Sequence, residues 1–371
     1  MSATASNIFD QDDLLGVLEQ MPFSSPEYSR EVVNKAARVL LAPDTSILDH
    51  FEVEQSFLVI GNWRSSHNFP LNTFQTTLRV KARQVSTHSL VAQRIKRLSS
   101  IALKLRRFPD MRLSQMQDIA GCRAILRTVA DVDSLVKLYK RSDIKHKLAS
   151  EDDYIRNPKP SGYRGIHIVY RYFSDKKPTF NNLKVEMQFR SLLQHAWATA
   201  VETVGTFIQQ ALKSSQGEQE WLRFFSLMGT AIAFREKTAP VPDTPTSPVE
   251  LQRELRQLVR KLKVQDHLRV YAAALGDPEV VGARRDAHYY LLELDPIGKK
   301  IKVTGYKSDE LDRASTDYLA IERRALSGPS IHDAVLVSVE SIEALKRAYP
   351  NYFLDTHRFI MAVNLAIKKR R

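Results

Sequence analysis

The stretch LKVEMQFR, at residues 183–190, decides the fold class because its apolar and polar side chains alternate without a break. Its odd-numbered positions are apolar and its even-numbered positions are polar, the latter including Glu186, Gln188 and Arg190. A period of two is typical of a β-strand with one buried face. Two further strand-like runs precede it, IAGCRAILR at 119–127 and IHIVYRYF at 166–173.

Helical spacing of apolar residues predicts helices around these strands, over residues 26–42, 85–107, 131–141 and 191–213. The helix over 85–107 is strongly basic and is ended by Phe108-Pro109. A loop rich in turn formers, NPKPSGYRG at 157–165, leads into the strand-like run at 166–173. Strands mixed with helices in this way predict an α/β (α+β) fold built on a mixed sheet.

The stretch EKTAPVPDTPTSPVE, at 236–250, has four prolines and few apolar residues. It is predicted to link one domain over 1–235 to a second domain over 251–371. Beyond it the pattern predicts an amphipathic helix over 249–276, a β-hairpin over 287–306 that turns at Asp295-Pro296-Ile297-Gly298, helices near 308–324, 340–347 and 355–369, and a strand over 333–338.

Composition excludes several classes of protein. The apolar runs are far shorter than a membrane span, and the acidic start MSATASNIFDQDD lacks the basic and apolar regions of a signal peptide, so a cytoplasmic protein is expected. Cys122 is the only cysteine, which excludes a disulfide framework and a cysteine-rich zinc site.

The net charge of +13 favours a polyanionic partner, such as nucleotide phosphates, RNA or an acidic protein surface, although a generally basic protein would have the same charge. The charge is uneven, because residues 79–112 contain ten Lys or Arg residues and Asp110 as the only acid. Compensating acids would be expected on an ordinary solvated helix face.

This basic run supplies candidate ligands for phosphate groups. On the predicted helix, Lys96, Ser100, Lys104 and Arg107 follow Arg94 at spacings that place them along one stripe. Such a stripe would suit a triphosphate, because separate cations can contact separate phosphates. A solvated basic face has the same spacing, so the spacing alone leaves both interpretations open.

Two carboxylates are candidates for magnesium ligands. Asp118 stands at the start of the predicted strand at 119–127, and Glu186 lies mid-strand on the polar face beside Gln188. Mg²⁺ prefers oxygen ligands and bridges nucleotide phosphates. An aspartate at a strand edge can also cap a turn, and a polar strand face usually contacts solvent, so the residue types alone favour those ordinary roles.

The loop at 157–165 is the most unusual segment. Gly162 and Gly165 give the backbone freedom on either side of Tyr163, and Lys159, Arg164 and His167 supply positive or titratable groups. A tyrosine held there could stack on a nucleobase, although packing against a turn is its ordinary role. No Walker-type glycine loop is present, so ATP would not be held as in P-loop enzymes.

Four segments, taken in order, resemble the RelA/SpoT-type pyrophosphokinase domain: RIKRLSSIALKLRR (94–107), MQDIAGCRAIL (116–126), DYIRNPKPSGYRGIHIVY (153–170) and VEMQFRSLLQHAWATAVE (185–202). The resemblance covers roughly residues 30–215. It implies a nucleotidyltransferase-like mixed sheet flanked by helices, and attack of a 3′-hydroxyl on the β-phosphate of ATP with release of AMP.

The resemblance also implies roles for individual residues. Arg94 and Arg123 would sandwich the adenine of ATP, while Lys96, Lys104 and Arg107, with Ser100 in the same stripe, would hold its phosphates. Asp118 and Glu186 would bind Mg²⁺, and Glu186 is the candidate base for the attacking hydroxyl. Tyr163 would stack on the acceptor base, and Lys159, His167 and Gln188 would complete the acceptor site.

The layout, a synthetase region followed by about 120 further residues, is similar to the toxic small alarmone synthetases and to the fused toxin–antitoxin group called CapRel. That resemblance implies a small α+β, zinc-finger-like C-terminal domain without zinc. It further implies pyrophosphorylation of the tRNA CCA end, autoinhibition, and release by a phage protein such as a capsid protein, as anti-phage defence. An alarmone synthetase acting on GDP, GTP or an adenine nucleotide is the alternative function, and an inactive RNA-binding module is the third hypothesis.

Tyr306, Tyr349 and Tyr352 could contact the site, although core packing is the ordinary role of each.

Overall fold

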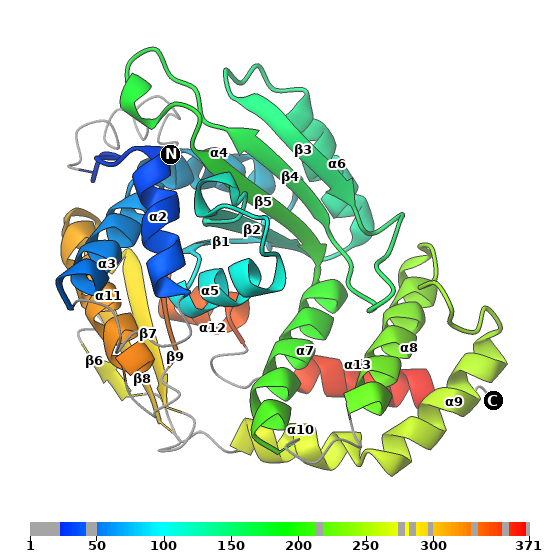
Figure 1. Cartoon of the computed structure of the whole chain (residues 1–371). Helices are drawn as coiled ribbons and strands as arrows, with labels where there is room; N and C mark the ends of the chain where they lie inside the picture. Colours follow the sequence, from blue (N-terminus) through cyan, green and yellow to red (C-terminus); the bar gives the residue numbers. More distant parts are fainter. Residues whose placement is uncertain are drawn as a thin grey trace, which may run out of the picture.

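The computed structural model describes residues 23–41, 50–211, 218–273, 279–281, 287–295, 300–327, 333–350 and 356–368. Over these residues the strands form one nine-stranded sheet in the order β3-β4-β5-β2-β1-β9-β7-β8-β6 (Figure 1). The strands are β1 Leu90–Ile95, β2 Ala120–Leu126, β3 Lys147–Asp153, β4 Ile166–Arg171, β5 Lys184–Ser191, β6 Glu279–Val281, β7 Tyr289–Asp295, β8 Lys300–Tyr306 and β9 Asp333–Ser338. The pairs β2/β5 and β6/β8 are parallel and the others antiparallel, so the predicted mixed α+β class is confirmed.

The described helices are α2 Arg30–Leu40, α3 His50–Ser65, α4 Asn68–Val85, α5 Leu98–Arg107, α6 Val129–Lys140, α7 Leu192–Ala211, α8 Glu218–Glu236, α9 Pro248–Lys261, α10 Val264–Ala273, α11 Leu311–Ser327, α12 Ile342–Ala348 and α13 His357–Ile367. Short 3₁₀ turns lie at η2 Leu113–Gln115, η3 Pro178–Phe180 and η4 Ser308–Glu310. None of the helices in this part of the chain has the length and apolar content needed to cross a membrane.

The two faces of the sheet differ. The apolar face of β5 packs with α4 and α6, where Phe74, Tyr139 and Phe189 are almost fully buried. On the same side, α11 covers β7 and β9. The opposite face is polar along β5 and β4, and α12 covers it only over β1, β9 and β7. The alternation read from residues 183–190 therefore separates a core face from a polar face.

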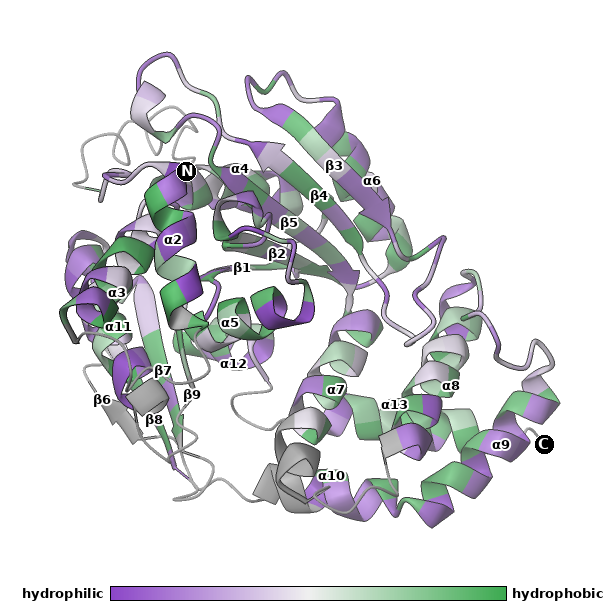
Figure 2. Ribbon diagram, viewed as in Figure 1, coloured by the Kyte–Doolittle hydropathy of each residue, from purple (hydrophilic) through white to green (hydrophobic). Residues whose placement is uncertain are grey.

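A bundle of helices stands beyond the end of β5. α7 follows that strand directly, and α8, α9, α10 and α13 pack around it (Figure 1). α9 is banded by hydrophilic and hydrophobic residues in Figure 2, and its buried side chains are Leu251, Leu255 and Val259. The predicted helix over 249–276 is in fact two helices, broken at Leu262-Lys263, where Lys263 has a φ of 44°.

The predicted helix over 85–107 is wrong in its first half. Residues 90–95 form the strand β1, and the helix α5 begins only at Leu98. β1 lies between β2 and β9, so pairing on both edges satisfies its backbone and outweighs any helical preference. Lys96 is therefore not on the same helix as Ser100, Lys104 and Arg107.

Most of the other predicted elements agree with the structure. The strands at 119–127, 166–173, 183–190 and 333–338, the helices at 26–42, 131–141 and 191–213, and the three helices after residue 307 are confirmed to within a few residues. The hairpin strands β7 and β8 pair antiparallel as predicted, while the turn at residues 296–299 lies outside the described residues. α3, α4, α8, β3 and β6 were not predicted from the sequence.

Strands that precede residues 236–250 in the sequence and strands that follow them belong to the same sheet, because β9 pairs with β1 at Gln93 and Arg94. The division into domains at 1–235 and 251–371, like the zinc-finger-like character of the second, stays a prediction.

Candidate active site

The candidate residues meet on the polar face of the sheet where β1, β2, β5 and β4 lie side by side. Gly121 of β2 pairs with Arg94 on one side and with Glu186 on the other. A Cβ at Gly121 would have only one neighbour, at 3.9 Å, so the space between Arg94 and Glu186 is open. Gln188, next along β5, pairs with Arg123 and His167. The register thus brings together side chains from four strands.

Asp118, just before β2, is held by two lysines. Lys96 Nζ lies 2.9 Å from one carboxylate oxygen and Lys104 Nζ lies 2.8 Å from the other. Burial raises the pKa of Asp118, but the two ammonium groups outweigh it and hold that pKa below its ordinary value. The predicted convergence of Lys96 and Lys104 is present, although one lies in a loop and the other on α5. Ser100 is on α5 one turn before Lys104, and Arg107 is exposed at the end of that helix.

Glu186 is bonded at both oxygens. His167 Nδ1 donates at 2.9 Å and Gln188 Nε2 donates at 2.6 Å. Burial raises the pKa of Glu186, but the His167 and Gln188 contacts and the charge of Lys104 bring it down to about 2. Glu186 in turn raises the pKa of Asp118, which indicates that the two carboxylates are near enough to repel each other. Both are therefore ionised at neutral pH.

A chain of hydrogen bonds leads from Glu186 to Tyr163. His167 Nδ1 donates to the carboxylate, and its Nε2 shares a hydrogen bond with the Tyr163 hydroxyl at 2.5 Å. Arg190 donates to the same hydroxyl at 2.5 Å, and its guanidinium lies 4.9 Å from the tyrosine ring centre. Lys159 Nζ lies 5.4 Å from that ring. Tyr163, Lys159, His167 and Gln188, the predicted acceptor group, thus form one cluster, to which the structure adds Arg190.

The loop that presents Tyr163 is fixed by its neighbours. Gly162 has a φ of 95°, and a Cβ there would lie 2.7 Å from the carbonyl oxygen of Phe225 in α8. The Arg164 side chain, 2% exposed, donates to Ile155 O at 3.2 Å, to Gly229 O and Thr238 Oγ1 at 3.3 Å, and to Ala239 O. Burial lowers the Arg164 pKa to about 10. In the sequence Arg164 is only one of several charged loop residues, because its contacts to α8 and to the segment after it lie about 65 to 75 residues away.

Arg123 is covered by the segment after α12. Its guanidinium lies 5.7 Å from the ring centre of Tyr349 and donates to Ala348 O at 3.4 Å. Tyr349, 3% exposed, donates its hydroxyl to Gln93 O at 3.0 Å and packs with Leu345 and its neighbours. Tyr349 therefore combines the expected core packing with a direct contact to a predicted adenine ligand. Tyr306 is a core residue bonded to Asp317, and Tyr352 lies outside the described residues.

Asp118 and Glu186 have the carboxylate chemistry that a magnesium ion bound together with phosphates would need. The described residues contain no group of three or more His, Cys, Asp or Glu that could form a complete protein cage. Mg²⁺ commonly uses one or two carboxylates and completes its shell with phosphate oxygens and water. A magnesium ion would require Asp118 to release at least one lysine, and a bound phosphate would give that lysine a new partner.

Similarity to known proteins is concentrated on these strands. Residues 93–205 match the model described as "Region found in RelA / SpoT proteins". This RelA/SpoT region contains Arg94, Asp118, Tyr163 and Glu186, together with the other predicted site residues.

The curated relatives of the RelA/SpoT region include two proteins of Bacillus subtilis. GTP pyrophosphokinase YjbM is 36% identical over 112 residues, which are 29% of this chain and 52% of YjbM. GTP pyrophosphokinase YwaC is 25% identical over 155 residues, 38% of this chain and 73% of YwaC. The chain thus spans about half the length of the first of these relatives. Among solved structures, small alarmone synthetase 2 from Bacillus subtilis is 22% identical, with a TM-score of 0.39 over 50% of this chain and 95% of that one.

Proposed function

We propose that the chain is an ATP-dependent pyrophosphokinase that transfers the β,γ-diphosphate of ATP to a ribose 3′-hydroxyl. The observation that supports this best is the arrangement around Asp118, where two lysines neutralise a carboxylate beside a second ionised carboxylate, Glu186. The matched RelA/SpoT region and the names of the curated relatives point to the same chemistry.

The lysines and carboxylates exchange partners when ATP binds. Lys96 and Lys104 turn from Asp118 to the phosphate oxygens, and the two carboxylates become available to Mg²⁺. Bound magnesium would neutralise phosphate charge. The hydroxyl oxygen then forms a bond to the β-phosphorus, and the bond from that phosphorus to the α,β-bridging oxygen breaks, so that AMP leaves with its electron pair.

The proton of the attacking hydroxyl passes by way of the Glu186 and His167 pair to water. A carboxylate whose pKa is about 2 orients that hydroxyl more than it retains its proton. Catalysis therefore depends mainly on positioning and charge neutralisation.

The acceptor is the 3′ end of tRNA in this proposal, which would block translation. The charge of +13 supports it, because clustered Lys and Arg favour an RNA backbone. The alternative acceptor is a free guanine or adenine nucleotide, favoured by the two relatives named GTP pyrophosphokinases and by Lys159 beside Tyr163. An inactive RNA-binding module is disfavoured, because such a module would have no use for two ionised carboxylates.

One assay distinguishes these acceptors. The full chain is incubated with γ-labelled ATP and one added acceptor, which is purified tRNA, GDP, GTP, AMP or ADP, and the labelled product is identified. Label on tRNA supports the proposal, and label only on free nucleotide replaces tRNA by the alternative. Absence of label from all of these acceptors, in the full chain and in the Tyr349→Ala variant described next, would contradict the pyrophosphokinase function.

The C-terminal segment is autoinhibitory in this proposal. In this segment, the ring of Tyr349 covers the Arg123 guanidinium and the Ala348 carbonyl accepts a hydrogen bond from it. Without these contacts the guanidinium would be available to adenine. A phage protein such as a capsid protein, binding the C-terminal region, would withdraw this segment and activate the toxin.

The Tyr349→Ala variant tests this autoinhibition and keeps β9 in the sheet, whereas deletion of residues 251–371 would remove that strand. Transfer should rise several-fold, while Tyr306→Ala, a matched loss of a buried tyrosine that does not contact Arg123, should not raise it. Equal rates in the Tyr349→Ala variant and the native chain would contradict the inhibitory role.

A further inference from the structure

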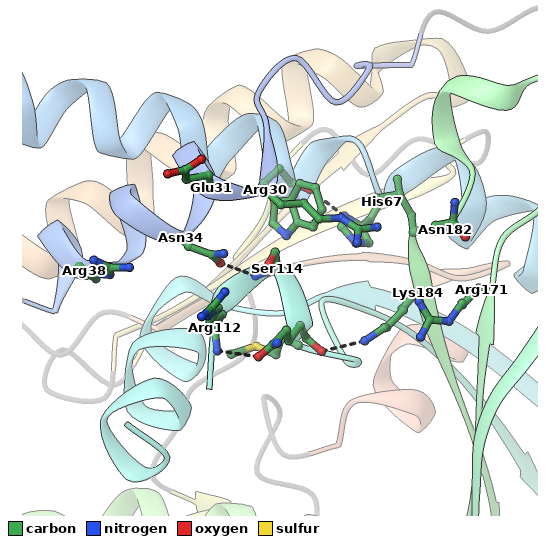
Figure 3. Close-up of a pocket in the computed structure, with 14 residues that line it drawn as sticks. Arg30, Glu31, Asn34, Arg38, His67, Arg112, Ser114, Arg171, Asn182 and Lys184 are labelled. Atoms are coloured by element: carbon green, nitrogen blue, oxygen red, sulfur yellow. Dashed lines mark hydrogen bonds between the residues drawn. The ribbon is translucent and has the colours of Figure 1, made fainter. Parts of the chain in front are cut away.

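A strongly basic cavity lies outside the candidate active site. A cavity of about 860 Å³ opens between α2, η2 and the paired ends of β4 and β5 (Figure 3). None of the predicted site residues lines it. Its volume is in the range of pockets that enclose a small molecule.

The walls of this cavity are unusually basic. They include five cations and one acid, Glu31, the cations being Arg30, Arg38, Arg112, Arg171 and Lys184. Over the described part of the chain, no ion pair joins any of these cations to a carboxylate, although Lys184 Nζ donates to Gln115 O at 2.9 Å. Figure 3 shows Arg171 and Lys184 side by side, with Arg30 across the cavity from them.

Repulsion within this group is evident at Lys184. Burial lowers its pKa first, and the charges of Arg171 and Arg30 lower it further. Like charges held together in this way are relieved by a bound anion, because each cation then gains an attractive partner.

The inner wall contains a hydrogen-bond donor that is not used. Trp63 lines the cavity and is 6% exposed, and its Nε1 has no hydrogen-bond partner among the described residues. Beside it, His67 donates Nδ1–H to Trp63 O at 2.7 Å, and burial lowers the His67 pKa to about 4, so this imidazole is neutral. A buried N–H group without a partner is rare in native proteins.

We propose that this cavity binds a small oligophosphate, the di- or triphosphate group of a nucleotide, separately from the ATP site. Five cations on three sides match an anion with several negative charges, and Asn34, Asn182 and Gln115 supply neutral polar groups around it. A nucleotide can enter a cavity of this size, whereas the backbone of a folded RNA would contact only the exposed rim of Arg30, Arg38 and Arg112.

Binding here would be linked to the active site. Lys184 is two residues before Glu186 on β5, and Gln115 is three residues before Asp118. An anion that recruits Lys184 competes for the ammonium group that now bonds Gln115 O, and so loosens the tie between the two carboxylate-bearing segments. This regulatory consequence rests on the proposed function, but binding itself does not.

The test counts binding sites in the full-length chain. Inorganic tripolyphosphate is titrated by calorimetry at low and moderate salt, with tryptophan fluorescence as a second signal because Trp63 lines the cavity. We expect two sites per chain. Arg171→Ala and Lys184→Ala should weaken one site at least tenfold, and Lys104→Ala should weaken the other. The Trp63→Phe variant should lose the fluorescence response to the cavity site.

Arg127→Ala is the matched control, since it removes one exposed positive charge at the far end of β2. If Arg127→Ala lowers the affinity for tripolyphosphate as much as Arg171→Ala does, the anion is attracted by the net charge of the chain alone, and the proposal is overturned. Unchanged stoichiometry and affinity in Arg171→Ala and Lys184→Ala would also overturn it. If only an RNA oligonucleotide binds, and Arg171→Ala weakens that binding, the cavity is an RNA contact and the nucleotide proposal fails.

The two proposals can fail separately. Two tripolyphosphate sites without pyrophosphate transfer to any acceptor, in the full chain and in the Tyr349→Ala variant, would contradict the proposed function and retain the cavity site. Pyrophosphate transfer by a chain that binds tripolyphosphate only at the Lys104-dependent site would support the proposed function and contradict the cavity proposal. Circular dichroism and the Tm of each variant confirm that the fold is intact.

Discussion

Two clusters of cations lie at opposite ends of the segment from Arg112 to Asp118, and they differ in how their charge is balanced. At the active-site end, Lys96 and Lys104 share the carboxylate of Asp118. At the cavity end, Arg171 and Lys184 have no ion pair with a carboxylate within the described residues. A cluster whose cations are paired with an acid exchanges partners when an anion binds, whereas cations that form no ion pair gain an ionic partner from the bound anion.

Removing the internal acid should have the largest effect. Asp118→Asn makes the active-site cluster resemble the cavity, because both lysines lose their carboxylate. Pyrophosphate transfer should fall by about 10²–10³-fold, while tripolyphosphate should bind more tightly at this site. Initial rates with labelled ATP and calorimetry measure the two changes.

Asp110→Asn, at an exposed aspartate in the same basic segment, is the control and should leave both quantities unchanged. Transfer by Asp118→Asn within tenfold of the native rate would show that the balanced cluster is not needed for the reaction.

The second carboxylate should make the fold sensitive to acid. The pKa of Glu186 is about 2 in the folded chain against an ordinary value of 4.5, so its contribution to stability is present above about pH 4.5 and is lost as the pH falls towards 2. That contribution is on the order of 3 kcal/mol, because each pKa unit corresponds to about 1.4 kcal/mol.

Glu186→Gln should therefore lower the free energy of unfolding at pH 6 and reduce its decline between pH 5 and pH 3. Denaturant unfolding at several pH values measures this. Glu250→Gln, at an exposed glutamate of α9, should unfold like the native chain. A constant difference between Glu186→Gln and the native chain over this pH range would contradict the depressed pKa.

A third effect is expected where the acceptor loop meets α8. Arg164→Ala leaves buried carbonyl oxygens of Ile155, Gly229 and Ala239 without this donor, and should cost about 3 kcal/mol of stability. The KM for the acceptor should rise more than the KM for ATP, because the loop presents Tyr163. Arg164→Lys keeps the charge and should restore part of the stability. Equal changes in both KM values would mean that Arg164 only stabilises the fold.

Local pattern predicted the elements whose own residues determine their structure. The alternation at 183–190 correctly gave β5 and its polar face, and the apolar runs gave β2, β4 and β9. Residues 90–95 form a strand because β2 and β9 lie on either side of them, and β9 begins more than 200 residues later. Helical spacing in a basic run could not reveal that pairing.

The same distinction applies to the site. Asp118 and Glu186 could be chosen by residue type and resemblance, but their proximity depends on the parallel register that sets Gly121 beside Glu186. Arg190 was visible on the polar strand face, and only the folded loop shows that it contacts Tyr163. The cavity could not be foreseen, because Arg30 and Arg171 are 141 residues apart in the sequence (171 − 30).

An acid placed in the cavity should make it resemble the active site. Asn182→Asp introduces a carboxylate among the cations at a residue whose φ of 69° suits aspartate as well as asparagine. Affinity of the cavity site for tripolyphosphate should fall by about tenfold, as expected for a loss of about 1.4 kcal/mol. The Lys104-dependent site should keep its affinity, and calorimetry distinguishes the two. If both sites weaken equally, the change acts through overall charge and the two clusters are not independent.

The smallest effect is expected at the contact between the C-terminal segment and β1. Tyr349→Phe removes the hydroxyl that donates to Gln93 O at 3.0 Å but keeps the ring near Arg123. One such hydrogen bond contributes about 1 kcal/mol, so the Tm should fall by a few degrees or less. Because the ring would still cover the guanidinium, transfer by Tyr349→Phe should stay at the native rate, in contrast to the increase expected for Tyr349→Ala. If transfer by Tyr349→Phe rises as much as transfer by Tyr349→Ala, the inhibition depends on the hydroxyl and its hydrogen bond to β1. The contact between the tyrosine ring and Arg123 would then have no regulatory role.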